Sequence, residues 1–236
     1  MHPSRPPSSR RGFTLSEILI TMGISTLVVG AALVFFIYQL NIFAYDVSKN
    51  RVNRDIRAFT SELTDNATFA NGFQIFPNFS TRSSTTTTTL NGTTTSTTVS
   101  ANLVDQQSGD MLVLYFRDPN NDTLTNRIVG YYRAPVDPSM LDQNDPRALG
   151  PVRKFDLAIN PASAAPLYTL LPAASTYATN GEVIELSKGL SNGKLFYNIG
   201  NKLIMINGQI IHRGGLGSTR YERATNTYNF TISPRG

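Results

Sequence analysis

The stretch of sequence that decides the fold of this chain is residues 10–45, which read RRGFTLSEILITMGISTLVVGAALVFFIYQLNIFAY. From Ile18 to Tyr45 it runs for 28 residues without a charge. At about 1.5 Å per residue, its most apolar part, residues 18–38, would span roughly 32 Å as a helix, which matches the hydrocarbon core of a bilayer. We therefore predict a transmembrane helix over residues 13–45.

The charges on either side of this segment indicate its orientation. Arg5, Arg10 and Arg11 precede it, and only Lys49 and Arg51 follow it closely. The positive-inside rule therefore favours a cytoplasmic N-terminus, with the bulk of the chain outside. A secretory signal peptide also begins with basic residues, but its apolar region is only about 7–15 residues long. The apolar run of this chain is too long for that class.

One acidic residue, Glu17, stands at the edge of the apolar segment, five positions after Gly12. Ionisable groups within a membrane segment are costly and usually pair with another charge. We therefore predict that Glu17 is a functional residue. The alternative is a solvated glutamate that merely precedes an anchor.

The junction RRGFTLSE at residues 10–17 resembles the cleavage and methylation motif of type IV prepilins and type II secretion pseudopilins. The resemblance implies that a prepilin peptidase removes residues 1–12 as a leader, cutting between Gly12 and Phe13, and methylates the new amino group of Phe13. It also implies that Glu17 attracts the N-terminal amine of a neighbouring subunit during assembly. Opposite charges attract strongly in a low dielectric, whereas either charge alone is penalised there.

The same resemblance implies the partners and the location of the protein. The partners would be the prepilin peptidase, other pilin or pseudopilin subunits, an inner-membrane assembly platform and membrane lipid. The chain would cross the inner membrane once, with its C-terminal domain outside the cytoplasm, and enter a filament after assembly. No cofactor is expected.

Composition limits the other possibilities. Charged residues make up only 16% of the chain, against roughly 25% in typical soluble domains, which suits burial in an assembly or a membrane. Without the three arginines of the leader, 18 basic residues stand against 16 acidic ones, so no basic patch for nucleic acid is expected. The chain has no cysteine, which excludes a disulfide framework, a thiolate metal site and a cysteine nucleophile.

Beyond the apolar segment, the pattern predicts that the helix continues as an amphipathic half over residues 46–72. Asn71-Gly72 then provides a stop, so a single helix would run from about Phe13 to Ala70. The apolar residues of this second half recur at spacings of seven, four, three and four, on one face of a helix: Tyr45, Val52, Ile56, Phe59 and Leu63.

The remainder, residues 73–236, is predicted to form an extracytoplasmic β-rich globular domain. Its β-type runs are separated by turn residues, above all at residues 118–122, which read DPNND. The expected strands cover residues 111–116, 127–133, 152–157, 183–186, 195–199, 203–206 and 228–232. A long helix lying across antiparallel strands gives an α+β fold, which matches the pilin layout.

Two shorter segments of this domain carry distinct signals. Residues 80–100 are rich in Ser and Thr and cannot build a core; we expect an exposed loop, either disordered or hairpin-like, with O-linked sugar attachment or an adhesive surface as alternatives. Asn207-Gly208 stands between two apolar runs, 202–206 and 209–212. It predicts a β-hairpin with its turn at these two residues.

The finer subtype is indicated by two features. The order of the strands from Met111 to Leu157 resembles minor pseudopilins of the J type and W-type minor pilins. The chain also lacks the cysteine pair that closes the C-terminal loop of many major pilins. Both features favour a minor pilin or a pseudopilin.

The search for catalytic residues gives only weak candidates. His212 is the one histidine that would remain after removal of the leader, and a strand-end residue explains it better than a Ser/His/Asp mechanism. The glycine-rich segment 213–219 has no lysine of the kind that binds phosphate, so we predict a turn there. Glu182 and Glu185 would point to opposite faces of a strand, which does not suit paired acid/base catalysis.

Two further groups of residues are candidates for binding, one for calcium and one for another protein surface. A calcium site would have to use Asp105, Asp110, Asp118 and Asp122, but these lack the spacing of a recognisable calcium loop. No metal ligand is therefore predicted. Tyr131 and Tyr132 could form an exposed contact surface, but a strand directs alternate side chains to opposite faces, so a core role for the inward one is favoured.

The sequence thus favours a non-enzymatic filament subunit that is processed at Gly12–Phe13 and assembled through Glu17. The alternative is a membrane-anchored extracytoplasmic enzyme or binding protein with a prepilin-like N-terminus. Replacement of Glu17 by alanine distinguishes them, because it should impair assembly of a pilin and leave an anchored enzyme active.

Overall fold

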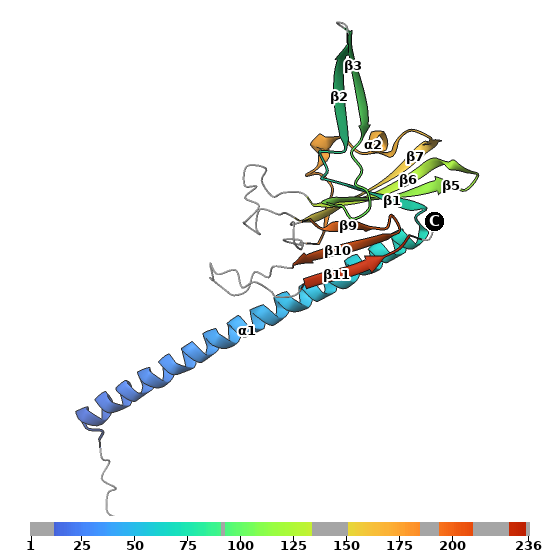
Figure 1. The fold of residues 1–236 in the computed structure, drawn as a ribbon. Coiled ribbons are helices and arrows are strands. Elements are labelled where there is room, and N and C mark those ends of the chain that lie inside the picture. The colour runs from blue at the N-terminus through green and yellow to red at the C-terminus, as the bar shows by residue number, and fades with distance from the viewer. Residues whose placement is uncertain (1–11, 91–92, 134–150, 185–193, 210–226, 235–236) are drawn as a thin grey trace, which may run out of the picture. The chain divides into compact units, whose positions relative to one another are not determined.

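A computed structural model describes residues 12–90, 93–133, 151–184, 194–209 and 227–234 (Figure 1). One long helix precedes a set of antiparallel strands, which confirms the predicted α+β class. The elements, in chain order, are α1 (Leu15–Phe69), β1 (Gly72–Phe76), β2 (Ser83–Leu90), β3 (Thr93–Ser100), β4 (Ser108–Gly109), β5 (Met111–Asp118), β6 (Asn121–Arg133), β7 (Val152–Ser163), α2 (Leu167–Leu170), η3 (Ala174–Thr176), β8 (Gly181–Ile184), β9 (Phe196–Ile199), β10 (Leu203–Gln209) and β11 (Thr227–Ile232).

The chain divides into two compact units, and the boundary falls within α1, between Val47 and Ser48. In the first unit, every large apolar side chain from Phe13 to Phe43 is exposed. Residues Leu15–Ala44 form the one helical segment, among the described residues, that is long and apolar enough to cross a membrane. This is the segment in which the sequence predicted a transmembrane helix.

The second unit begins with the C-terminal part of α1, which buries one face. Phe59 and Leu63 are fully buried, as predicted, and Ala67 and Ala70 extend the same face. The spacings of four, four and three keep these side chains on one side of the helix. The side chains of Tyr45 and Val52 lie outside the described part of the chain.

Two larger sheets and a separate hairpin make up the rest of this unit (Figure 1). The first sheet has the strand order β1-β5-β6-β7-β8, and the second has the order β11-β10-β9-β4. All of the pairings are antiparallel. The predicted turn at residues 118–122 is confirmed, because Asp118 pairs with Asn121 at the tip of the β5–β6 hairpin.

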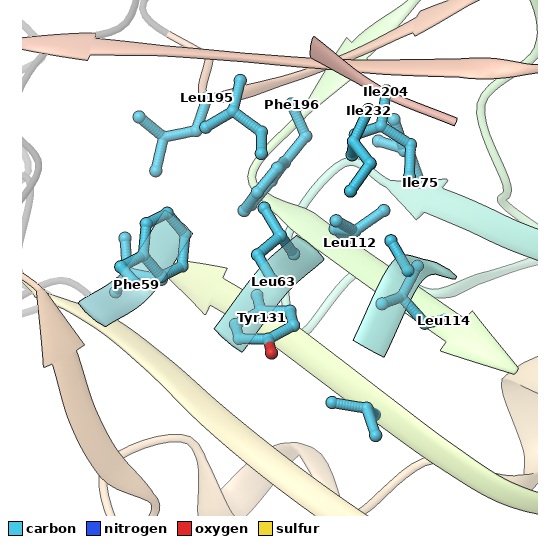
Figure 2. Close-up of a cluster of buried hydrophobic side chains, with 14 of the residues drawn as sticks. Phe59, Leu63, Ile75, Leu112, Leu114, Tyr131, Leu195, Phe196, Ile204 and Ile232 are labelled. Carbon is cyan, nitrogen blue, oxygen red and sulfur yellow. The ribbon is translucent and has the colours of Figure 1, made fainter. Parts of the chain in front are cut away.

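The main core lies where α1 meets both sheets (Figure 2). Phe59 and Leu63 of α1 face Leu112 and Tyr131 of the first sheet, and the ring of Phe59 meets that of Tyr131 edge to face at 5.8 Å. The second sheet closes this core with Phe196, Ile204, Ile206, Tyr228 and Ile232.

A second core covers the opposite face of the first sheet. Its buried members are Phe76, Phe79, Met111, Val113, Ile128, Tyr132, Phe155 and Leu171. Tyr131 and Tyr132 therefore point to opposite faces, as strand alternation requires, yet both are fully buried because both faces are covered. The exposed contact surface considered for them is not formed. Burial raises the pKa of both tyrosine hydroxyls, which stay protonated.

Polar contacts join α1 to the first sheet at the edge of the main core. The amide Nδ2 of Asn66 donates to the hydroxyl of Tyr131 at 2.8 Å. Glu62, one turn earlier on the helix, forms an ion pair with Lys154 of β7. Because these partners are far apart in sequence, they fix the rotation of this part of α1 on the sheet.

The predicted hairpin turn at Asn207-Gly208 is wrong. Both residues lie inside β10, where they pair with Asn229 and Tyr228 of β11. The turn before β10, which joins it to β9, contains Gly200 and Asn201, whose φ values of +63° and +53° lie in the left-handed region. Of the predicted second run, Gln209 belongs to β10, and residues 210–212 lie outside the described part of the chain.

The sequence did not predict strand β1, and it left two alternatives open for residues 80–100. The predicted stop at Asn71-Gly72 leads directly into β1, which pairs with β5 along its whole length. The Ser/Thr-rich segment 80–100 contains the β2–β3 hairpin, so the hairpin-like alternative is the one observed.

A buried ionic cluster is centred on Asp110, between β4 and β5. Its carboxylate accepts from Nη2 of Arg133 at 2.6 Å and from Nζ of Lys194 at 2.9 Å. Asp110 is only 8% exposed, so loss of this carboxylate would break two ion pairs at a buried position. By contrast, the Arg127–Asp156 pair is half-exposed, although Arg127 holds the pKa of Asp156 below its usual range.

Replacing Asp110 by asparagine is expected to lower the free energy of unfolding by about 3–5 kcal/mol, because it removes the buried carboxylate that forms two ion pairs. Asp156→Asn is the matched control and should cost about 1 kcal/mol or less, because solvent screens its pair. Thermal and denaturant unfolding of the full chain in detergent micelles would measure both. Equal losses for the two variants would contradict the structural importance of the Asp110 cluster.

Candidate assembly site at the N-terminus

The residues before α1 leave the chain accessible at the predicted cleavage point. Gly12, Phe13 and Thr14 precede the first helical residue, Leu15, and have no regular secondary structure. Phe13 is 83% exposed, and a Cβ at Gly12 would meet no atom within 4 Å. A peptidase needs an open backbone on both sides of the bond, and Gly12–Phe13 offers one. Arg10 and Arg11 lie outside the described residues.

Glu17 is held at the start of α1 by Thr14. Its Oε2 accepts from the backbone nitrogen of Thr14 at 2.9 Å and from the Thr14 hydroxyl at 2.9 Å. In return, the backbone nitrogen of Glu17 donates to the Thr14 hydroxyl at 3.4 Å. This reciprocal arrangement is a capping box, with Thr14 as the N-cap and Glu17 as the third helical residue.

The capping box was missed at the sequence level, although its signal was present. The pattern Thr14-x-x-Glu17 in front of an apolar run is the usual signature of such a cap. It gives Glu17 a structural role that differs from the predicted pairing with an amine. The two roles are compatible, because the cap uses Oε2 and, within the described residues, no hydrogen bond engages Oε1.

The hydroxyl groups deeper in the segment are satisfied by the helix itself. Thr21 donates to the carbonyl oxygens of Glu17 and Ile18, each at 2.9 Å. Thr26 bonds in the same way to Met22 and Gly23, at 3.0 and 2.9 Å. Because these hydroxyls have backbone partners, they do not oppose insertion of the segment into lipid. Glu17 is the one acidic or basic residue in Leu15–Ala44.

The other candidate residues are not brought together in the described part of the chain. Asp105, Asp110 and Asp118 each bind protein groups, namely the backbone of Gly200, the Arg133–Lys194 pair and the backbone of Asn120. No group of three potential metal ligands occurs there. Glu182 forms an ion pair with Arg153 at 2.7 Å. Glu185, His212 and segment 213–219 lie outside the described residues.

Comparison with known sequences agrees with this geometry. Residues 7–33 match a family profile described as the prokaryotic N-terminal methylation motif. The chain has a type IV prepilin-like N-terminus. The matched range contains Gly12, Phe13, the capping box and the first part of the exposed apolar helix. No curated protein and no solved structure matches the chain, so the prepilin-like N-terminus is the part that relates it to a known family.

The capping box of the prepilin-like N-terminus is expected to depend on the Thr14 hydroxyl. Thr14→Ala should destabilise the first turn by about 1 kcal/mol, the usual cost of losing an N-cap. Amide hydrogen exchange in the first turn, measured on the full chain in micelles, should accelerate by about fivefold. Ser25→Ala is the control, because it removes a hydroxyl further along the same helix. Exchange that is equal in the two variants would show that the cap does not form in solution.

Proposed function

We propose that the chain is a structural subunit, a minor pilin or a pseudopilin, of a type IV pilus or a type II secretion filament. The observation that carries the proposal is the coincidence of the methylation motif at residues 7–33 with an exposed apolar helix. An apolar surface of this extent has to be covered by lipid or by other helices. A filament core of such helices provides the second kind of cover.

Processing would create the charge that assembly uses. Hydrolysis of the Gly12–Phe13 peptide bond by a prepilin peptidase converts the backbone nitrogen of Phe13 into a basic amine. Methylation keeps this amine basic, so it stays positively charged. The same cut removes the basic leader, which would otherwise hold this end of the chain at the cytoplasmic face.

Glu17 would then supply the complementary charge on the neighbouring subunit. Two unit charges 4 Å apart attract by about 4 kcal/mol at an effective dielectric constant of 20. The capping box fixes the carboxylate close to the end of the helix through Oε2, and Oε1 forms no hydrogen bond within the described residues. A charge at a fixed position along the helix sets the axial register between two neighbouring helices, because only one register brings it next to the amine of the neighbour.

The remaining features fit an extracytoplasmic position for the second unit. The basic leader favours a cytoplasmic N-terminus, and α1 provides a single candidate span. The lack of cysteine distinguishes the chain from the many major pilins that close a C-terminal loop with a disulfide. We therefore favour a minor pilin or pseudopilin that is delivered by an inner-membrane assembly platform.

The alternative function is a membrane-anchored extracytoplasmic enzyme or binding protein. It shares the anchor with the first proposal and differs in the role of Glu17, which would then act only as part of the helix cap. An anchored enzyme or binding protein would yield no filaments, which separates the two proposals. The two roles of Glu17 can be separated because glutamine also fits the third position of a capping box, whereas it carries no charge.

Glu17→Gln and Glu17→Ala are both expected to reduce assembled protein, recovered as sheared filaments, by at least about tenfold, because each removes the charge of the pair. Asp46→Asn, which removes a carboxylate just beyond the span, is the matched control and should assemble normally. If Glu17→Gln assembles like the unmodified chain and only Glu17→Ala fails, Glu17 acts through the cap. If both assemble normally, the charge of Glu17 has no role in assembly. If the unmodified chain yields no filaments, the proposed function is wrong.

A further inference from the structure

The β2–β3 hairpin is an uncharged projection of the second unit (Figure 1). Its strands read SSTTTTTL and TTTSTTVS and contain neither a charged residue nor a proline. The described side chains of both strands are exposed, except for the partly buried Ser100 at the base. The hairpin is attached at that base by Arg82, which donates to the carbonyl oxygen of Pro172 and lies over the ring of Phe79.

The register shows which backbone groups remain unpaired. Ala101 donates its backbone N–H to the carbonyl of Arg82 at 2.9 Å, which makes 82 and 101 a hydrogen-bonded pair. Alternation along the ladder then assigns Thr86 and Thr97 to another such pair. The backbone groups of Thr85, Thr87 and Thr89 on β2, and of Thr94 and Ser96 on β3, point away from the hairpin. These two rows form its open edges.

Side-chain contacts agree with this assignment. The hydroxyls of Thr85 and Thr98, of Thr87 and Ser96, and of Thr89 and Thr94 lie 3.0, 3.3 and 3.2 Å apart. Such contacts need the closer approach of pairs that do not exchange backbone hydrogen bonds. The hydroxyl of Tyr168 donates to the carbonyl of Thr98 at 3.3 Å, so this carbonyl faces outward as expected.

Native sheets usually protect an open edge by charge, proline, a bulge, a short strand or a covering element. Apart from the contact of Tyr168 at Thr98, near the base of β3, the β2–β3 ladder has none of these protections in the described residues. It runs through eight continuous pairs, carries no charge and is exposed on both faces. A two-stranded hairpin is also marginally stable by itself in water. Both properties are explained if another strand completes the sheet.

We propose that the partner is the same hairpin of a second copy of this chain, with β3 of one copy pairing antiparallel to β2 of the next. This inference rests on the proposed filament function and requires that copies of this chain are neighbours in the filament. Subunits of a filament share one orientation, and copies related in this way bring opposite edges of their hairpins together, which is an open, head-to-tail contact. The absence of charge removes repulsion between copies, and the threonine ladder of each hairpin repeats across the new boundary.

The pairing defines the residues that come close between copies. Thr86 and Thr97 use their backbone groups within their own hairpin, so across the new boundary they form a pair without backbone hydrogen bonds. In such pairs the Cα atoms are about 4.5 Å apart, which is within the range that a disulfide can join. Because the natural chain has no cysteine, single introduced cysteines report this contact without background.

The test uses full-length Thr86→Cys and Thr97→Cys chains, produced separately and together in a host that assembles the filament. After mild oxidation with copper phenanthroline, the mixed population is expected to shift to a band of twice the monomer mass on a non-reducing gel. Each chain alone should remain monomeric. A mixture of Thr97→Cys with Thr123→Cys, an exposed threonine of β6, is the matched control. Adding Ser96→Lys to the Thr97→Cys chain should abolish the dimer, because it places a charge on the open edge.

Sheared filaments without a dimer in the mixed population would overturn the inference and leave the proposed function intact. Dimers in the single-cysteine populations would also overturn it, because they indicate a contact between like edges. If the unmodified chain yields no filaments, the proposed function fails and the inference fails with it. A dimer confined to the mixed population supports the contact, and it shows that two copies stand side by side in the assembly.

Discussion

The apolar surface of the first half of α1 is the constraint on which the rest of the chain depends. Each large apolar side chain from Phe13 to Phe43 is exposed. Moving one such side chain out of water is favourable by about 1.5–3 kcal/mol. The segment therefore has to be covered by lipid or by other helices. This requirement links the membrane span, the prepilin-like motif and the proposed filament. A helix that moves from lipid into a filament core keeps its apolar surface out of water throughout.

Glu17 is the one acidic or basic residue within this segment, and its environment suits a move of the helix from lipid into a filament core. The capping box satisfies donors at the start of the helix through Oε2, while the second oxygen is available to an incoming amine. The β2–β3 hairpin presents a similar situation in the second unit, where open backbone groups have no partner within the hairpin itself. Each of the two units thus carries polar groups that a neighbouring subunit would satisfy under the proposed function.

Much of the fold could be predicted from local patterns. The limits of α1, the buried face at Phe59 and Leu63, and most strands followed from periodicity, because each element buries a face with a regular repeat. The failures came from interactions between distant segments. Asn207-Gly208 favours a turn locally, but pairing with β11 keeps it extended inside β10. Tyr132 is buried by a second core whose members are spread over the sequence.

The candidate site was predicted in part. The motif placed Gly12, Phe13 and Glu17 at the junction, because their spacing is local and specific. The role of Thr14 was not predicted, although Glu17 stands three residues after it, at the spacing of a capping box. The open edges of the hairpin could not be predicted from composition, because they depend on the register between β2 and β3.

Intact mass and N-terminal sequencing of the membrane-extracted protein from its native host test the central claim most directly. The account predicts a mature chain that begins at N-methyl-Phe13, after a cut following Gly12. Retention of Met1 and the leader, or a cut beyond the apolar segment, would contradict it and would identify an anchored or a secreted protein instead.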